Sequence, residues 1–257
     1  MTRAWYWSSR WLPQGWLDAL RQLAIFAGAY YGYRLVRGFV DGQVSVAFEH
    51  ARMLVSVERN LGLFFEPQVQ RWALDHSWII DGANWLYVNS HFTITLSFLV
   101  WLYLARNSAF YWVRNMFVIA MFLALVGYLV FPAAPPRLLP EWGFADTVST
   151  FVGQDGANTA SVLYNPYAAV PSMHVAFALM VGIPAMKLVR YRVLKVLWAF
   201  YPLLVTFVVI VTANHFWADA ALGAMVAAIS AYTAHALAIA RPEAWSWRTA
   251  LGARATA

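Results

Sequence analysis

The chain has 257 residues, of which 61% are hydrophobic and only 12% are charged. A soluble domain is normally about a quarter charged, so this composition excludes an ordinary water-soluble enzyme. The net charge of +6 does not indicate nucleic-acid binding, because the basic residues are dispersed among apolar segments, and the absence of cysteine excludes disulfides and thiolate metal sites.

Six apolar segments follow one another along the chain. An apolar run of about 20 residues can cross a bilayer, and the predicted spans are 18–38, 79–105, 110–131, 171–189, 193–213 and 216–240. With no internal repeat or linker between them, we expect a single domain over residues 1–257. The predicted fold is an all-α integral membrane protein, a bundle of six transmembrane helices.

The charges between these spans predict the topology. The two tails, the 2–3 connection and the 4–5 connection hold 12 Lys/Arg and 2 Asp/Glu, whereas the other side holds 6 and 10. Short loops rich in Lys and Arg stay in the cytoplasm. We therefore expect a multi-pass cell-membrane protein with both termini cytoplasmic, including the tail 241–257, and with the 1–2, 3–4 and 5–6 connections outside.

Three segments flank the predicted core 18–240. Residues 1–17 mix tryptophans with arginines and are typical of an interfacial anchor. Residues 43–65 have the periodicity of an amphipathic helix, which either lies on the outer membrane surface or packs on the bundle. The long connection 132–170 is rich in aromatic residues, so we expect a folded cap with a short helix near 145–152.

The first candidate site is the sequence Pro171-Ser-Met-His174, at the outer end of the fourth predicted span. Proline suits the first turn of a helix, and the free amides of that turn attract anions. Ser172 and Met173 then predict a phosphate site beside the imidazole of His174. The alternative is a histidine that only caps an interfacial helix.

The second candidate site is the pair His215 and Asp219, which are four residues apart at the start of the sixth span. This spacing places both on one helical face. A carboxylate on one imidazole nitrogen orients the other nitrogen and stabilises the cation that forms when the ring acts as a nucleophile. The alternative is a structural ion pair at a helix end.

Two further residues are predicted to line the same site. Arg137 follows two prolines in the 3–4 connection, and a guanidinium matches the oxygens of a transferring phosphoryl group. His91 lies in a polar patch of the second span, where it is expected to support the site or bind substrate. Two histidines and one aspartate could also hold a metal, but helix N-termini repel cations, so no metal or cofactor is predicted.

Together these stretches resemble the type 2 phosphatidic acid phosphatase superfamily, in its branch similar to fungal inositol phosphorylceramide synthase. The matching stretches are Val57–Glu66, Phe131–Arg137, Gly143–Thr147, Asn165–His174 and Thr212–Asp219. The resemblance implies a six-helix bundle and metal-independent catalysis through a phosphohistidine. It implies His215 as nucleophile, Asp219 as its orienting partner and His174 as acid and base, with Ser172, Met173 and Asn214 around the phosphate.

The sequence departs from the superfamily pattern at three places. The usual first motif, a Lys followed six residues later by Arg-Pro, is absent, and Arg137 is its nearest substitute. Met173 stands where the usual Pro-Ser-Gly-His motif has its glycine. Val209 stands where the family has an arginine six residues before the nucleophilic histidine. These changes favour the transferase-like branch, in which a phospholipid is the substrate and a small alcohol the acceptor. The alternatives are a phosphatase of lipid or polyprenyl phosphates with water as acceptor, a non-catalytic lipid-binding membrane protein, and a metalloenzyme. The sequence does not specify the oligomeric state.

Overall fold

The computed structural model describes residues 12–38, 44–153 and 167–241, and these residues form helices, turns and one isolated parallel bridge between Ala133 and Ala168. Most of the predicted N-terminal anchor and of the C-terminal tail lies outside the described residues. In chain order the helices are α2 (Gly15–Gly38), α3 (Val44–Asn60), α4 (Glu66–Leu74), α5 (Ser77–Trp85), the π-helix η1 (Leu86–Ser90), α6 (His91–Ala105), α7 (Asn107–Val130), the 3₁₀ turns η2 (Pro136–Leu138) and η3 (Pro140–Trp142), α9 (Met173–Leu188), α10 (Arg192–Val211) and α11 (Trp217–Ala240).

Four helical segments of the described chain are long and apolar enough to cross a membrane: Ser77–Ala105, Asn107–Val130, Arg192–Val211 and Trp217–Ala240. These correspond to four of the six predicted spans. The described residues therefore give an all-helical protein with four candidate membrane spans, and the predicted count of six is not confirmed. The two differences are the segments predicted at 18–38 and 171–189.

The segment predicted at 18–38 forms α2, which is long enough to span but carries a polar face. Asp18 is buried and accepts hydrogen bonds from Gln22 at 2.9 Å, from the Tyr103 hydroxyl at 3.0 Å and from the Tyr111 hydroxyl at 2.8 Å. Arg114 of α7 in turn donates to Gln22 at 2.7 Å. These polar contacts attach α2 to α6 and α7. The polar residues Asp18 and Gln22 that make them also lower the hydropathy of α2.

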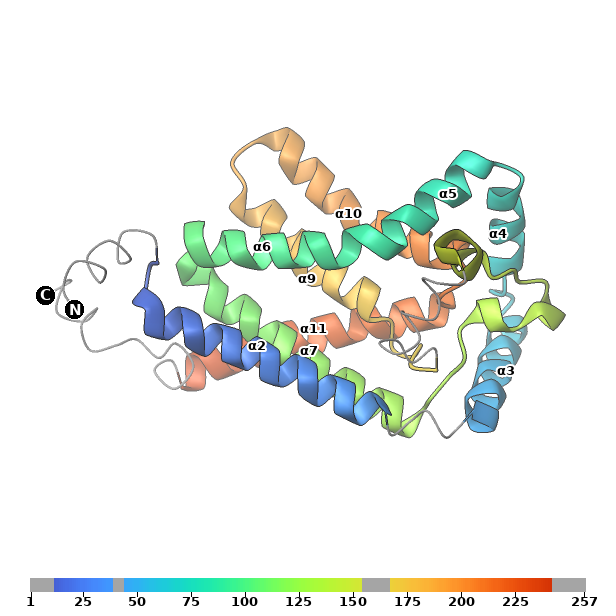
Figure 1. Cartoon of the computed structure of the whole chain (residues 1–257), viewed down its shortest axis with the longest axis horizontal. Coiled ribbons are helices and arrows are strands. Elements are labelled where there is room, and N and C mark those ends of the chain that lie inside the picture. The colour runs from blue at the N-terminus through green and yellow to red at the C-terminus, as the bar shows by residue number, and fades with distance from the viewer. Residues whose placement is uncertain (1–11, 39–43, 154–166, 242–257) are drawn as a thin grey trace, which may run out of the picture.

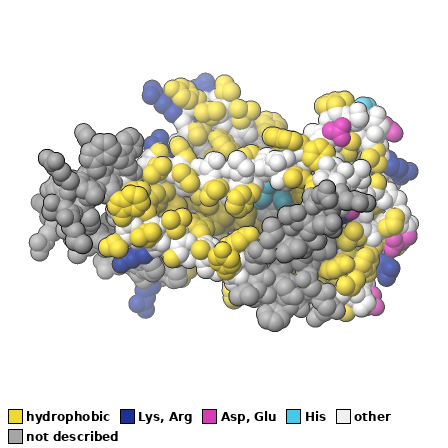
Figure 2. Space-filling model, in the orientation of Figure 1, with side chains coloured by type: hydrophobic (Ala, Val, Ile, Leu, Met, Phe, Trp, Pro, Cys, Tyr) yellow, Lys and Arg dark blue, Asp and Glu magenta, His cyan; other side chains and the backbone are white. Residues whose placement is uncertain are grey.

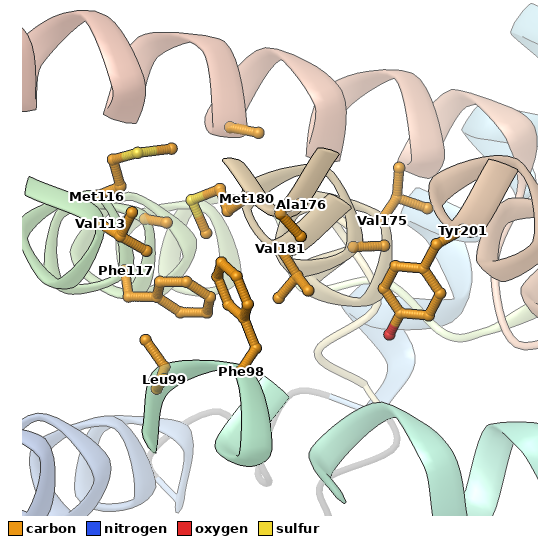
Figure 3. Packing of buried hydrophobic residues seen from close by; sticks show 14 of the residues in the cluster. Phe98, Leu99, Val113, Met116, Phe117, Val175, Ala176, Met180, Val181 and Tyr201 are labelled. Atoms are coloured by element: carbon orange, nitrogen blue, oxygen red, sulfur yellow. The ribbon is translucent and has the colours of Figure 1, made fainter. Parts of the chain in front are cut away.

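The segment predicted at 171–189 forms α9, which has only 16 residues but is the central helix of the bundle. It packs against α6, α7, α10 and α11, and Figure 3 shows its side chains Val175, Ala176, Met180 and Val181 interdigitating with neighbours such as Phe98 and Phe117. Because α9 is enclosed by other helices, Ser172 and Val175 at its start are buried, while Met173 and His174 between them are half-buried. Any side chain at its start is thus held by several elements.

The ends of the bundle differ in character. The helices α2, α6, α7 and α11 run roughly along the long axis, and α3 and α4 lie at one end (Figure 1). Figure 2 shows acidic side chains gathered at that end, while apolar side chains cover much of the long helices, as expected for surfaces in lipid. The predicted amphipathic helix is α3, which ends at Asn60 and buries Ala47, Ala51, Val55 and Glu58. The predicted short helix of the cap covers residues 147–153.

Candidate active site

The first candidate histidine, His174, lies in the first turn of α9. Ser172 is the N-cap residue, fully buried, and its Oγ accepts from the amide of Val175 at 3.5 Å. The helix thus begins after Pro171, slightly later than predicted, because the serine side chain rather than the proline ring starts it. The first-turn amides of Met173 and His174 have no acceptor within the helix, and the Ser172 amide donates to the Asp219 backbone oxygen at 3.0 Å.

The second histidine, His215, lies in the turn that joins α10 to α11. The amides of Asn214 and His215 both donate to the Val209 oxygen, at 3.0 and 3.2 Å, so the turn folds back on the end of α10. His215 Nδ1 lies 3.4 Å from Asp219 Oδ2, which also accepts from the Phe216 amide at 3.0 Å. The pair is therefore made across the start of α11, and not along one helical face as predicted, because Phe216 is the N-cap residue.

The two histidine sites meet in the interior. The ring centroids of His174 and His215 are 5.5 Å apart, those of His174 and His91 are 4.6 Å apart, and Tyr87 stacks on His174 at 4.7 Å. The predicted convergence of two imidazoles is present, and His91 adds a third. Tyr87 belongs to the π-helix η1, which ends at Ser90, directly before His91 at the start of α6.

Arg137 reaches this centre through Asn214. Its Nε donates to Asn214 Oδ1 at 3.1 Å and its NH1 lies 2.8 Å from Asp146 Oδ2. Only 8% of the Arg137 side chain is exposed, so this ion pair is largely shielded from water. Two arginines of the helices α3 and α4 have other contacts: the Arg59 guanidinium lies 4.4 Å from the Trp142 ring centroid, and Arg71 donates to the Pro67 oxygen at 3.2 Å.

The comparison with known families fits this centre. The family model described as PAP2 superfamily matches residues 52–233, which is more than half of the chain and contains every candidate site residue. The chain belongs to the PAP2 superfamily. No curated protein and no solved structure matches it. Membership indicates lipid phosphatase or phosphotransferase activity in a membrane.

Two carboxylates of this PAP2 protein were not predicted as part of the site. Glu58 on α3 and Glu66 on α4 are both fully buried, and their Oε1 atoms accept from the amides of Ala218 at 3.1 Å and Trp217 at 2.9 Å. Burial first, and the neighbouring Glu66 second, raise the pKa of Glu58 to about 9, and burial raises the pKa of Glu66 as well. Both residues fall in the matching stretch 57–66, but the helical periodicity of residues 43–65 assigned Glu58 to a polar face, and Glu66 lies outside that segment.

A close helix contact holds the two histidine-bearing segments of the PAP2 core together. A Cβ atom built on Gly223 of α11 would overlap the backbone oxygen of Ser172, and it would lie 3.1 Å from the Ser172 carbonyl carbon. Only glycine therefore allows α11 to approach the start of α9 this closely. Gly182 permits a similar approach of α9 to α10, since a Cβ atom built on it would lie 2.7 Å from the Trp198 oxygen.

A cavity leads from the site toward the side of the bundle. It lies between α10 and the η1–α6 segment, and its walls are mostly apolar; the lining residues are Leu86, Tyr87, Ser90, His91, Ile94, His174, Tyr201, Leu204, Val205, Val208 and Val209. Within the described part of the chain, the Tyr201 hydroxyl and His91 Nδ1 are buried atoms without a hydrogen-bond partner. Figure 3 shows Tyr201 at one edge of the apolar cluster.

Proposed function

We propose that this PAP2 protein is a membrane enzyme that cleaves a lipid phosphoester through a phosphohistidine and transfers the phosphoryl-bearing group to an alcohol. The observation that supports this most directly is the meeting of His174, His215 and Asp219 at the buried starts of α9 and α11. His174 and His215, which are 41 positions apart in sequence, thus lie with their ring centroids 5.5 Å apart. This assignment follows the branch similar to inositol phosphorylceramide synthase.

The proposed first step is attack by His215 on phosphorus. Asp219 faces Nδ1, so Nε2 is the nitrogen that bonds to phosphorus, and the carboxylate stabilises the resulting positive charge on the ring. The bond between phosphorus and the lipid oxygen breaks, and His174 gives its proton to that oxygen. The products are a phosphohistidine and, from a phosphatidylinositol substrate, diacylglycerol.

The proposed second step returns the enzyme to its starting state. His174, now without the proton, accepts the proton of the acceptor hydroxyl, whose oxygen attacks phosphorus while the N–P bond breaks. In both steps the amides at the start of α9 bind the phosphate oxygens. Arg137 contributes positive charge beside Asn214, reduced by its ion pair with Asp146.

The cavity between α10 and η1–α6 supports a lipid as the substrate. Its apolar walls run from His174 to Leu204, a side chain of the candidate span α10 that is 45% exposed. An acyl chain in this position leaves the phosphate beside the histidines and stays in contact with the bilayer. The acidic end near α3 and α4, together with the basic α9–α10 connection, supports a site on the outer side with both termini in the cytoplasm.

The acceptor decides whether the same chemistry is transfer or hydrolysis. Transfer requires that water compete poorly for the phosphohistidine. His215 is only 6% exposed and Ser172 is fully buried, and such burial favours a bound alcohol over bulk water as acceptor. Hydrolysis of a lipid or polyprenyl phosphate is the alternative reaction of the same intermediate.

The test uses purified protein in detergent with phosphatidylinositol labelled in its headgroup, with and without an alcohol acceptor. Transfer is supported when label appears on the alcohol, and the phosphatase is supported when phosphatidic acid releases inorganic phosphate without any transfer. His215→Ala must abolish the reaction, whereas His235→Ala, at an exposed histidine of α11, must not. Absence of both reactions, and of any labelled histidine, would overturn the proposal in favour of a non-catalytic lipid-binding protein.

A further inference from the structure

The carboxylates of Glu58 and Glu66 occupy the start of α11. Trp217 and Ala218 are the first two residues of this helix, and their amides have no acceptor within it. Instead, Glu66 Oε1 accepts from Trp217 at 2.9 Å and Glu58 Oε1 from Ala218 at 3.1 Å. These donors are therefore satisfied by side chains from α3 and α4, about 150 positions earlier in the sequence.

The two bonded residues lie between His215 and Asp219. Any movement of the 217–218 peptide units changes the 3.4 Å separation of His215 Nδ1 and Asp219 Oδ2. The amides of 217 and 218 are also unavailable to a substrate anion, which leaves the start of α9 as the phosphate site. The two glutamates thus act on the arrangement of the histidine, and not on the substrate itself.

The charge around this helix start requires a proton. Three fully buried carboxyl groups, of Glu58, Glu66 and Asp219, surround it, and the only ion pair that any of them makes in the described part of the chain is that of Asp219 with His215. The Oε2 atoms of Glu58 and Glu66 both lack a partner there. A proton on one of these carboxyls removes one buried charge and lets it donate to the other.

We propose that Glu58 and Glu66 are positioning residues of the catalytic turn, a carboxyl pair that shares one proton and holds the start of α11 so that His215 faces both Asp219 and His174. This inference rests on the proposed function for its effect on catalysis. It assigns to the outer helices α3 and α4 a direct part in arranging the nucleophile. The pair carries one negative charge, which also suits the positive end of the helix dipole.

The substitutions that test the pair are glutamine and leucine at each position. A single Glu58→Gln or Glu66→Gln retains the acceptor oxygen and supplies N–H donors in place of the shared proton, so kcat remains within about threefold of the parent. Glu58→Leu and Glu66→Leu leave a buried amide without an acceptor, which costs about 1–3 kcal/mol and lowers kcat about 10- to 100-fold with KM little changed. Glu49→Leu, at an exposed position of α3, is the matched control.

The double variant Glu58→Gln/Glu66→Gln tests the shared proton. Two amides place donors opposite each other where one proton was held, so the double variant loses much more activity than the product of the single effects. Thermal unfolding in detergent identifies variants that do not fold. If the leucine variants do not fold, the proposal is tested by comparing the activities of the single and double glutamine variants.

A spectroscopic readout separates this inference from the proposed function. Nitrogen chemical shifts of labelled histidine, assigned to His215 by their loss in His215→Ala, report its tautomer and hydrogen bonding. We expect them to change in the leucine and double variants and not in Glu49→Leu. The inference is overturned if the His215 signals are unchanged in these variants, or if the activity loss of the double glutamine variant equals the product of the two single losses. If the His215 signals change but the parent protein shows no phosphoryl transfer, only the proposed function is overturned.

Discussion

Replacement of Gly223 by alanine tests how closely the two histidine-bearing segments must approach. The added Cβ would overlap the backbone oxygen of Ser172 and approach its carbonyl carbon to 3.1 Å. Backbone atoms at a helix start cannot rotate away as a side chain can, so α9 and α11 must separate. Overpacking of this kind costs about 1–3 kcal/mol of folding free energy.

The larger effect is expected on catalysis. A displacement of about 1 Å between reacting groups can cost about a hundredfold in rate, and Ser172 and His174 move with the start of α9. We expect Gly223→Ala to fold with a lowered unfolding temperature and to lose about a hundredfold in kcat, measured in detergent by unfolding and by transfer of labelled headgroup.

Two glycines of the same protein serve as controls for Gly223→Ala. Gly82→Ala, in a helix where nothing lies within 4 Å of the added carbon, should leave both quantities unchanged or raise stability slightly. Gly182→Ala, which meets the Trp198 oxygen at 2.7 Å between α9 and α10, should lower stability without a comparable loss of kcat. The reasoning is refuted if Gly223→Ala retains parental activity, or if Gly182→Ala impairs kcat equally.

Three further predictions concern the site and its surroundings. Tyr201→Phe removes a buried hydroxyl without a partner in the described chain, so the unfolding temperature should stay constant or rise. Loss of one hydrogen bond to the lipid substrate should raise KM about fivefold (about 1 kcal/mol). A fall in the unfolding temperature with unchanged KM would contradict this prediction. Activity should survive exhaustive chelation, measured as transfer after treatment with a chelator, and its loss with recovery on adding metal would favour a metalloenzyme. Because the pKa of Glu58 is raised to about 9 from its ordinary value of 4.5, its contribution to stability is fully present below about pH 4.5 and is lost as the pH rises toward 9, by about 1.4 kcal/mol per pH unit. Glu58→Gln should flatten that slope in denaturant unfolding, and equal slopes would contradict the raised pKa.

The candidate histidine segments were predictable from the sequence because their signals are local. Ser172 and His174 belong to the start of an apolar helix, and His215 and Asp219 are four residues apart, so spacing alone indicated which groups belong together. The topology rule then predicted both segments on one side. The roles of these residues remain predictions, whereas their proximity is visible in the structure.

The differences arise where distant contacts outweigh local pattern. The polar face of α2 is satisfied by Tyr103 and Tyr111, far along the chain, and the local sequence of α2 does not show these partners. Likewise α9 has only 16 residues, and its packing against α6, α7, α10 and α11 is not visible in its own segment. Helical periodicity assigned Glu58 to a solvated face of α3, although the start of α11 covers it. A residue's partners 160 positions away leave no periodic signal in its own segment.

The same long-range contacts explain why the turn that carries His215 and Asp219 is buried beneath the outer helices, whereas His174 opposite it is half-buried. His215 and Asp219 stand where α11 begins, a place that exposes unbonded amides in any helix. If water satisfied these amides, the turn would be solvated and the proposed phosphohistidine would be open to hydrolysis. Carboxylates from α3 and α4 satisfy them instead, at 3.1 and 2.9 Å, and cover the turn while leaving the cavity toward the side of the bundle. The arrangement that orders the nucleophile is therefore the same one that limits water, which is the condition transfer to an alcohol requires.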